Sequence, residues 1–380
     1  MDFTKLSDFM EHLVNWRIPG CSCIVYKDRE KVFEHSAGYR DIESGAKMKG
    51  DELFFMYSAT KPVVCAAALT LWEAGKFDLE DEVCKYLPEW SEMKVRRWNN
   101  DGTFDVVPAT KKAKVRHLFS MSAGLDYNTQ TPAIKAAIER TAPECPTREI
   151  ARAMADTVLC FEPGEHWNYS LCHDVLGALV EVIAGMPLAD YVKKVILDPT
   201  GMTDTEFGLR EERKSRMATE YSFNDATDQI ERHPTQDNWA IFGTKYHSGG
   251  AGLVSSVHDM ALFTEMLAAG GVNRKGERVL GKRTIDLMKS NQLCEEAMKD
   301  FNWSHLEGYS YGLGVRTMVD PALGASPSPV GEFGWTGAAG AYMLVDTENK
   351  LAVFYAHHML NNQEYYTAPR LRNIVYSCID

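Results

Sequence analysis

The sequence predicts an α+β fold, in which an antiparallel sheet flanked by terminal helices carries a large inserted and mainly helical region. Three observations predict it. Strand-like alternation occurs near both ends of the chain, helical periodicity fills the middle, and 45% of the 380 residues are apolar. We expect residues 1–75 and 300–380 to form one discontinuous sheet domain and residues 76–299 to form the helical part. A site is then expected in the cleft between them.

Individual elements follow from the spacing of apolar residues and from turn residues. Apolar positions three and four apart predict helices at residues 2–16, 59–74, 150–157, 174–184, 188–196, 257–269 and 370–378. Alternation predicts strands at residues 21–27, 31–38, 311–319, 339–345 and 351–357. Asn100-Asp101-Gly102 is typical of a hairpin tip, and the three prolines of residues 321–331 indicate a surface loop.

Charge and composition exclude several classes of protein. A formal net charge of −12 disfavours binding to nucleic acid, which needs clustered Lys and Arg, and binding to anionic membranes. No apolar run has the length of a membrane helix, and the N-terminus lacks the pattern of a secretory signal. Nine cysteines without zinc-site spacing suit a reducing compartment. We therefore expect a cytoplasmic protein that acts on a small molecule, with its oligomeric state open.

The tetrad Ser58-Ala59-Thr60-Lys61 is the first candidate for chemistry. Residues three apart share one helical face, so the Ser58 hydroxyl and the Lys61 ammonium can meet. A serine becomes a nucleophile when a nearby base takes its proton, and a lysine serves once its surroundings favour the neutral amine. The tetrad alone is weak evidence, because a helix N-cap at Ser58 and a solvated Lys61 would give the same pattern.

Two further motifs make the chain resemble the serine β-lactamase-like, penicillin-binding superfamily, which includes class C β-lactamases, DD-peptidases and family VIII carboxylesterases. The superfamily has a second, Tyr-x-Asn-type element, which corresponds here to Tyr169-Ser170-Leu171. Its third element is a Lys-Thr-Gly-type strand, which corresponds to Trp335-Thr336-Gly337. Residues 115–125 and 249–256 also look familial, and the resemblance extends from about residue 15 to the C-terminus.

The resemblance implies a role for each matching residue. Ser58 corresponds to the nucleophile that is acylated, and Lys61 and Tyr169 correspond to the proton-transfer pair. A phenolate beside a lysinium and a phenol beside a neutral lysine are two states of one coupled pair, so the acting base stays open. The backbone N–H groups of Ser58 and Ala338 would form the oxyanion hole. We expect no cofactor and no metal.

Two departures from the superfamily pattern bear on the substrate. Leu171 stands where lactamases have an Asn amide, and Trp335 stands where they have a Lys that attracts substrate carboxylates. Both changes favour neutral acyl esters, so the chain looks most similar to the family VIII carboxylesterases. A β-lactamase, a D-amino-acid peptidase or amidase, and an acyltransferase stay open as alternatives. A silent binding or sensor homologue is disfavoured because the chain keeps both nucleophile and lysine.

Four further residues are candidates for contact with the substrate. The resemblance implies that Tyr127 forms a wall of the cleft and that Thr336 and Gly337 line it as part of the third motif. His247 directly precedes a familial segment and is also expected to face the cleft. An α/β-hydrolase is disfavoured, because the best match to its Gly-x-Ser-x-Gly elbow, residues 120–124, begins with Ser.

Overall fold

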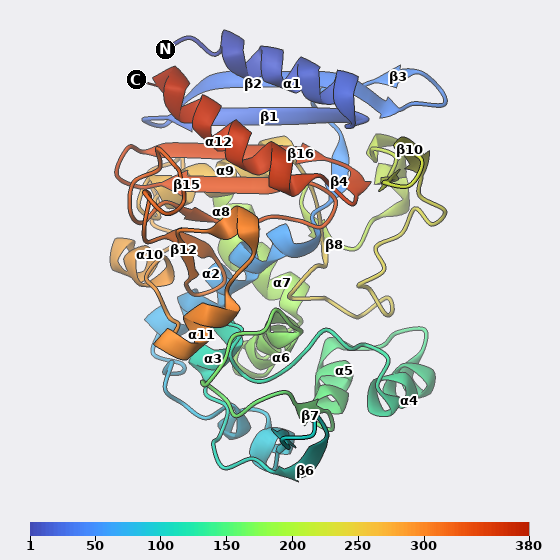
Figure 1. Ribbon diagram of the computed structural model, residues 1–380, viewed down its shortest axis with the longest axis vertical. Coiled ribbons are helices and arrows are strands. Elements are labelled where there is room, and N and C mark those ends of the chain that lie inside the picture. Colours follow the sequence, from blue (N-terminus) through green and yellow to red (C-terminus); the bar gives the residue numbers. More distant parts are fainter. Residues whose placement is uncertain (380) are drawn as a thin grey trace.

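The computed structural model describes residues 1–379 and contains an eight-stranded antiparallel sheet above a helical region (Figure 1). The strand order is β12-β13-β14-β15-β16-β1-β2-β3, so both ends of the chain build the sheet. The strands are β1 (Gly20–Lys27), β2 (Glu30–Asp41), β3 (Ala46–Lys47), β12 (Tyr309–Tyr311), β13 (Arg316–Met318), β14 (Phe333–Gly334), β15 (Tyr342–Asp346) and β16 (Leu351–His357). The predicted α+β class with a sheet from both termini is confirmed.

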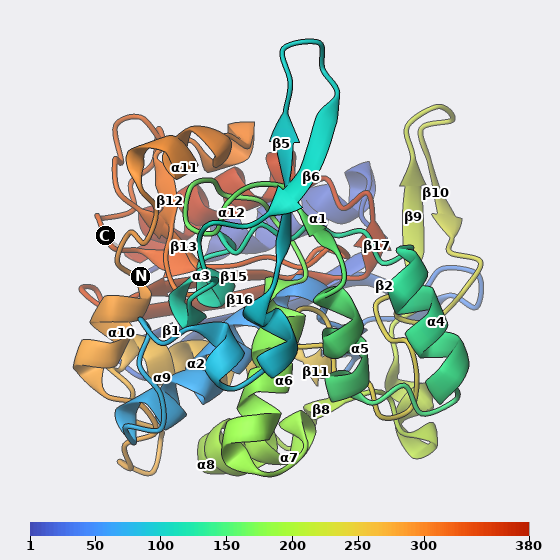
Figure 2. The ribbon, with the colours of Figure 1, turned by 90° about the horizontal axis from the view of Figure 1, so that it is seen from below.

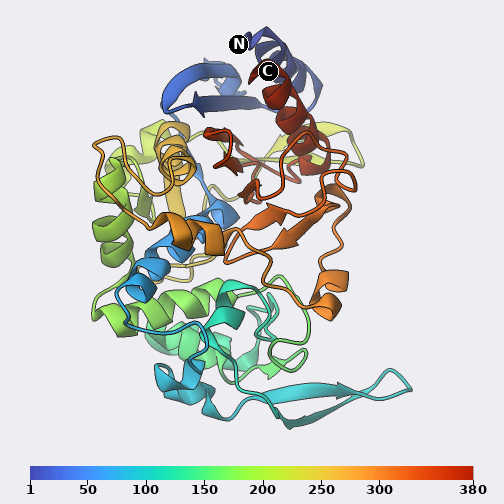
Figure 3. The ribbon, with the colours of Figure 1, turned by 90° about the vertical axis from the view of Figure 1, so that its left-hand side faces the viewer.

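Helices cover both faces of this sheet. The terminal helices α1 (Thr4–Trp16) and α12 (Glu364–Ile379) lie side by side on one face (Figures 1 and 3). Their apolar stripes are buried there, because one side of an amphipathic helix must pack against the core. Helix α9 (Val257–Ala268) packs on the other face against β1, β15 and β16.

The helical region surrounds α2 (Thr60–Glu73), in which every residue from Thr60 to Leu69 is buried. A helix that is apolar on all sides belongs in the interior, and α2 packs against α6 and α7. The remaining helices are α3 (Val115–Phe119), α4 (Pro132–Thr141), α5 (Thr147–Met154), α6 (Cys172–Ala184), α7 (Leu188–Val192), α8 (Asp198–Thr200), α10 (Lys282–Met288) and α11 (Glu295–Asp300). Helix α2 therefore packs within the helical region and α9 packs on the sheet. The predicted domain bounds had placed α2 in the sheet domain and α9 in the helical part.

Three small sheets complete the fold. They are β4 (Leu53–Phe55), β11 (Leu253–Ser256) and β8 (Glu206–Phe207); β10 (Gln229–Arg232), β9 (Tyr221–Asn224) and β17 (Met359–Leu360); and β6 (Phe104–Pro108), β5 (Lys94–Trp98) and β7 (Val158–Leu159). The hairpin β5–β6 projects from the body (Figure 2), and its tip coincides with the predicted turn at residues 100–102. Strand β4 leads directly into the turn that carries Ser58.

Two predicted elements differ from the structure. Residues 309–318 form a hairpin of two short strands, β12 and β13, where one strand over residues 311–319 was predicted, because the chain reverses between them and Gly312 N–H donates to the Val315 carbonyl (2.8 Å). Helix α12 begins at Glu364, six residues before the predicted start, and includes Pro369. Packing against α1 outweighs the cost of that proline.

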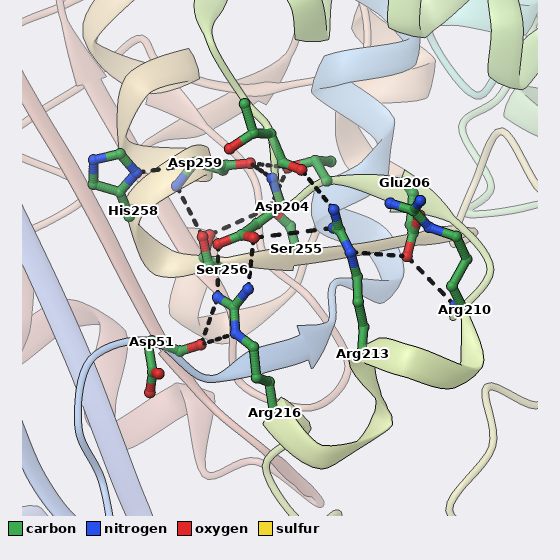
Figure 4. A network of polar contacts seen from close by, with 12 residues as sticks. Asp51, Asp204, Glu206, Arg210, Arg213, Arg216, Ser255, Ser256, His258 and Asp259 are labelled. Atoms are coloured by element: carbon green, nitrogen blue, oxygen red, sulfur yellow. Dashed lines mark hydrogen bonds and ion pairs between the residues drawn. The ribbon is translucent and has the colours of Figure 1, made fainter.

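An ion-pair network fastens residues 203–216 to the sheet side of the molecule (Figure 4). Arg216 binds both carboxylate oxygens of Asp204 at 2.7 Å and the backbone carbonyl of Asp51. Asp259, at the start of α9, accepts hydrogen bonds from Asp204 N–H and the Thr205 hydroxyl. This network holds the connection that leads into β9 against α9 and the chain before β4.

Among residues 1–379, no single helix is both long and apolar enough to span a membrane. One bent pair, α6 with Leu188–Thr200, meets the length and composition criteria, with an angle of 78° between its two parts.

Candidate active site

Ser58 lies in a tight 3₁₀ turn, Tyr57–Ala59, between β4 and α2. The sequence had placed it at the start of a helix, and α2 in fact begins two residues later. Tyr57 has φ +43°, a value that residues other than glycine rarely adopt, so its surroundings must hold it. The Tyr57 hydroxyl donates to Glu220 (2.7 Å), and its ring stacks on Trp239. This turn leaves the Ser58 side chain half-buried at the edge of the core.

Lys61 lies one helical turn after Ser58 and is fully buried. Its Nζ donates to the Ser58 Oγ at 3.0 Å, the Tyr127 hydroxyl at 2.9 Å and the Gly250 carbonyl at 2.7 Å. An ammonium has three protons and no lone pair, so these three acceptors match a protonated lysine. The alternative of a solvated Lys61 is wrong, since the side chain has no exposed surface.

Tyr169 is the second side chain that contacts the Ser58 hydroxyl. Its hydroxyl donates to the Ser58 Oγ at 2.6 Å, and the indole Nε1 of Trp335 donates to the Tyr169 oxygen at 3.2 Å. The Tyr169 ring packs between those of Tyr127 and Trp303, with centroids 5.3 and 5.4 Å away. The structure therefore joins Ser58, Lys61 and Tyr169 in one hydrogen-bonded cluster, as the sequence predicts.

The turn after Trp335, which carries the other oxyanion candidate, packs against Met56, two residues before Ser58. A Cβ on Gly337 would lie 2.4 Å from the Met56 carbonyl, so only glycine allows this strand end to pack against the chain before Ser58. The neighbouring Ala338 is exposed, and its N–H donates to no acceptor within residues 1–379. A free N–H at this place fits the predicted oxyanion role.

The candidates for substrate contact have different surroundings in the structure. Tyr127 is more than a cleft wall, because its hydroxyl accepts one of the three hydrogen bonds of Lys61. Leu171 is buried before α6 and lines a water-sized cavity of about 10 Å³ with Tyr127. Thr336 bridges to Tyr342 and is half-buried.

His247 lies outside this cluster. Its ring packs on Phe207, and its ring Nδ1 is 3.8 Å from a carboxylate oxygen of Glu181. The backbone N–H of His247 donates to the Thr147 hydroxyl. These contacts belong to α5, α6 and β8, so the structure does not bring His247 into the hydrogen-bonded cluster of Ser58, Lys61 and Tyr169. The chain turns toward α2 only three residues later, at Gly250.

Several residues of the cluster had not been recognised in the sequence. The Gly250 carbonyl is a ligand of Lys61, and backbone acceptors leave no trace in residue type. Trp303 packs on Tyr169, and Asp174 lies behind Lys61 in the first turn of α6. A signal for Asp174 existed, because a carboxylate inside an apolar helix is unusual.

Buried titratable groups beside Lys61 are held neutral. Burial, with Lys61 nearby, lowers the pKa of His173 to about 3. Burial raises the pKa of the Cys65 thiol well above its ordinary value. Burial and the neighbouring Tyr169 raise the pKa of Tyr127 well above its usual range, so its hydroxyl stays protonated. Tyr127 therefore acts as a neutral hydrogen-bonding partner of Lys61.

The structure also contains two large cavities. One, of about 790 Å³, lies between β5 and residues 160–168. The other, of about 820 Å³, lies between residues 208–219 and 236–244. Neither is lined by Ser58, Lys61 or Tyr169, so hydrogen-bond geometry rather than cavity size identifies the reactive centre.

Comparisons with known proteins find similar sequences over most of the chain. Residues 6–376 match the family described as Beta-lactamase. Protein Rv1367c of Mycobacterium tuberculosis is 31% identical over 336 residues, which cover 86% of this chain and 82% of that protein. Esterase EstB of Burkholderia gladioli is 29% identical over 381 residues, with 94% of this chain and 89% of EstB covered.

Solved structures show the same architecture. EstCE1, described as a hydrolase with promiscuous acyltransferase activity, superposes with a TM-score of 0.80 at 25% identity and covers 98% of both chains. A mutant of simvastatin synthase (LovD) from Aspergillus terreus gives a TM-score of 0.80 at 22% identity, with 99% of this chain and 97% of that chain covered. The second likeness bears on the fold alone.

Proposed function

Since the chain belongs to the β-lactamase family and is a serine hydrolase of that fold, we propose that it is a carboxylesterase that forms an acyl-enzyme on Ser58. The observation that carries this proposal is the cluster in which Ser58 Oγ contacts both Lys61 Nζ (3.0 Å) and the Tyr169 hydroxyl (2.6 Å). The substrate we propose is a small neutral acyl ester. EstB, an esterase by name, supports this choice over an amide.

Acylation follows from the positions of these groups. Acylation starts from the state in which the Lys61–Tyr169 pair has released one proton. The Ser58 oxygen attacks the ester carbonyl, its proton passes to the deprotonated member of the pair, and the carbonyl oxygen becomes an oxyanion. The N–H groups of Ser58 and Ala338 are proposed to stabilise that oxyanion. The pair then returns a proton to the leaving alcohol, and water releases the acyl group by the same steps in reverse order.

Trp335 adapts this cluster to esters. A lysine at this position would supply a positive charge for a substrate carboxylate, whereas the indole supplies one neutral N–H. That N–H is used internally, because it donates to Tyr169. Leu171 likewise offers no amide where the lactamase pattern has Asn. The remaining surface suits uncharged acyl and alcohol groups.

The experiment is hydrolysis of 4-nitrophenyl acetate and butyrate by the wild type, Ser58→Ala and Ser122→Ala. Ser122 is a matched control, since it is a buried serine in the segment that resembles an α/β-hydrolase elbow. We expect Ser58→Ala to lose activity and Ser122→Ala to keep it. Equal activity of Ser58→Ala and wild type would refute the proposal.

Acyl transfer is a second candidate, because EstCE1 carries promiscuous acyltransferase activity by name. Hydrolysis and transfer share the acyl-enzyme and differ only in the second nucleophile. Addition of a primary alcohol during ester turnover separates them: an ester of that alcohol among the products indicates transfer, and free acid alone indicates hydrolysis. Nitrocefin turnover at a rate comparable with ester turnover would instead favour a β-lactamase.

A further inference from the structure

Asp174 is a buried carboxylate that the mechanism above does not use. It lies in the first turn of α6, five residues after Tyr169, and is 2% exposed. Its Oδ1 accepts hydrogen bonds from the Ser248 hydroxyl at 2.6 Å and the Tyr246 hydroxyl at 2.8 Å. Burial and the adjacent Asp174 raise the pKa of Tyr246 well above its ordinary value, so that hydroxyl stays a donor. The carboxylate is thereby fixed in one orientation.

The other oxygen of Asp174 and the Lys61 ammonium both lie beside Gly250. A Cβ on Gly250 would lie 2.8 Å from Asp174 Oδ2 and 3.4 Å from Lys61 Nζ. The absence of a side chain at Gly250 thus allows the carboxylate and the ammonium to approach the same point. The Gly250 carbonyl accepts the shortest of the Lys61 hydrogen bonds, at 2.7 Å.

The positive charge of the buried Lys61 needs a negatively charged group nearby, because an uncompensated buried ammonium is strongly disfavoured. The groups that face it are Ser58, Cys65, Tyr127, Tyr169, His173, Asp174 and, behind Asp174, Tyr246. Cys65, His173, Tyr127 and Tyr246 are neutral for the reasons given above. Asp174 is the one carboxylate among these side chains, so it is the group that can balance the positive charge of Lys61.

We propose that Asp174 is a positioning residue for acylation: its charge, held by Tyr246 and Ser248 and acting across Gly250, sets the protonation state and position of Lys61. This inference rests on the proposed function, because it concerns the same proton-transfer pair. Asp174 touches neither Ser58 nor a substrate, and all three hydrogen bonds of Lys61 go to Ser58, Tyr127 and Gly250. Its influence is therefore electrostatic.

The test is Asp174→Asn, which removes the charge and keeps the shape. The Asn carbonyl oxygen can accept the same two hydrogen bonds from Tyr246 and Ser248. Loss of an opposite charge at this range makes a lysine release its proton more readily. We expect the limb of the kcat/KM profile that reports the Lys61–Tyr169 pair to move about 1–2 pH units lower.

Tyr246→Phe is the matched control, because it removes one hydrogen bond to the same carboxylate but leaves the charge. We expect the limb of its pH profile to move less than that of Asp174→Asn, because the charge of the carboxylate remains. An Asp174→Asn profile that also superimposes on the wild type, in a protein labelled normally at Ser58 by a fluorophosphonate, would refute the inference. If the fluorophosphonate does not label Ser58 in the wild type, the proposed function is refuted instead.

Gly250→Ala provides a second variant in case Asp174→Asn does not fold. Its methyl group would be inserted between the carboxylate and the ammonium, at 2.8 and 3.4 Å from them, and should push them apart. We expect a shift of the same limb in the same direction. A folded Gly250→Ala enzyme with an unshifted limb would contradict the inference independently of Asp174→Asn.

Discussion

The variant Trp335→Phe tests what the indole N–H contributes at the position where the lactamase pattern has a lysine. The variant keeps an aromatic ring beside Tyr169 and removes the Nε1–H that donates to the Tyr169 oxygen at 3.2 Å. When Tyr169 carries negative charge during proton transfer, such a bond contributes about 1.5–3 kcal/mol. A distance of 3.2 Å is long for this bond, so we take the lower end. Since about 1.4 kcal/mol is a tenfold effect on rate, we expect kcat/KM to fall about tenfold.

The assay is kcat/KM for 4-nitrophenyl butyrate together with the rate of labelling of Ser58 by a fluorophosphonate. Trp303→Phe is the control, because Trp303 packs on the Tyr169 ring at 5.4 Å without a hydrogen bond to its hydroxyl. Both measurements should fall together in Trp335→Phe and stay near wild type in Trp303→Phe. An unchanged Trp335→Phe, or an equal loss in both variants, would refute the role of the indole N–H.

Three other predictions concern the cluster and the core. Tyr127→Phe should lower kcat/KM about tenfold, because Lys61 loses one of three acceptors; normal labelling kinetics would contradict this. Glu332→Gln should cost about 3–5 kcal/mol in urea unfolding, since it leaves the buried Arg316 (3.2 Å away) unpaired. Burial lowers the pKa values of His173 and His357 to about 3, so between about pH 6.5 and 3 the unfolded chain binds more protons. Stability should therefore fall as pH drops below about 6.5, by about 2 kcal/mol per histidine at pH 5; urea curves unchanged between pH 7 and 5 would contradict this.

The parts of the site that could be predicted are those whose residues belong to short sequence motifs. Ser58 and Lys61 are three residues apart, and one helical turn brings them together whatever surrounds them. Tyr169 and Trp335 came from the superfamily pattern, because the sequence holds no sign that segments 111 and 277 residues away from Ser58 meet there. The structure then supplies the contact at 2.6 Å between Tyr169 and Ser58.

The parts that could not be predicted depend on packing between distant segments. The resemblance placed Tyr127 at the wall of the cleft, but no residue spacing indicates that its hydroxyl, carried on a loop, contacts Lys61. His247 precedes a glycine pair that does approach Lys61, but the backbone turns between them and leaves the ring on Phe207. The division of the chain into a sheet domain and a helical part missed α2 and α9, because each helix is buried on nearly all sides and periodicity gives it no preferred partner.

The acyl-enzyme on Ser58 is the central claim, and its direct test is mass spectrometry of the protein quenched in acid during turnover of 4-nitrophenyl butyrate. The account predicts one added butyryl group, located on the peptide that carries Ser58, and none in Ser58→Ala. Steady turnover with the butyryl group on another residue, or with no acylated protein at any quench time, would contradict it.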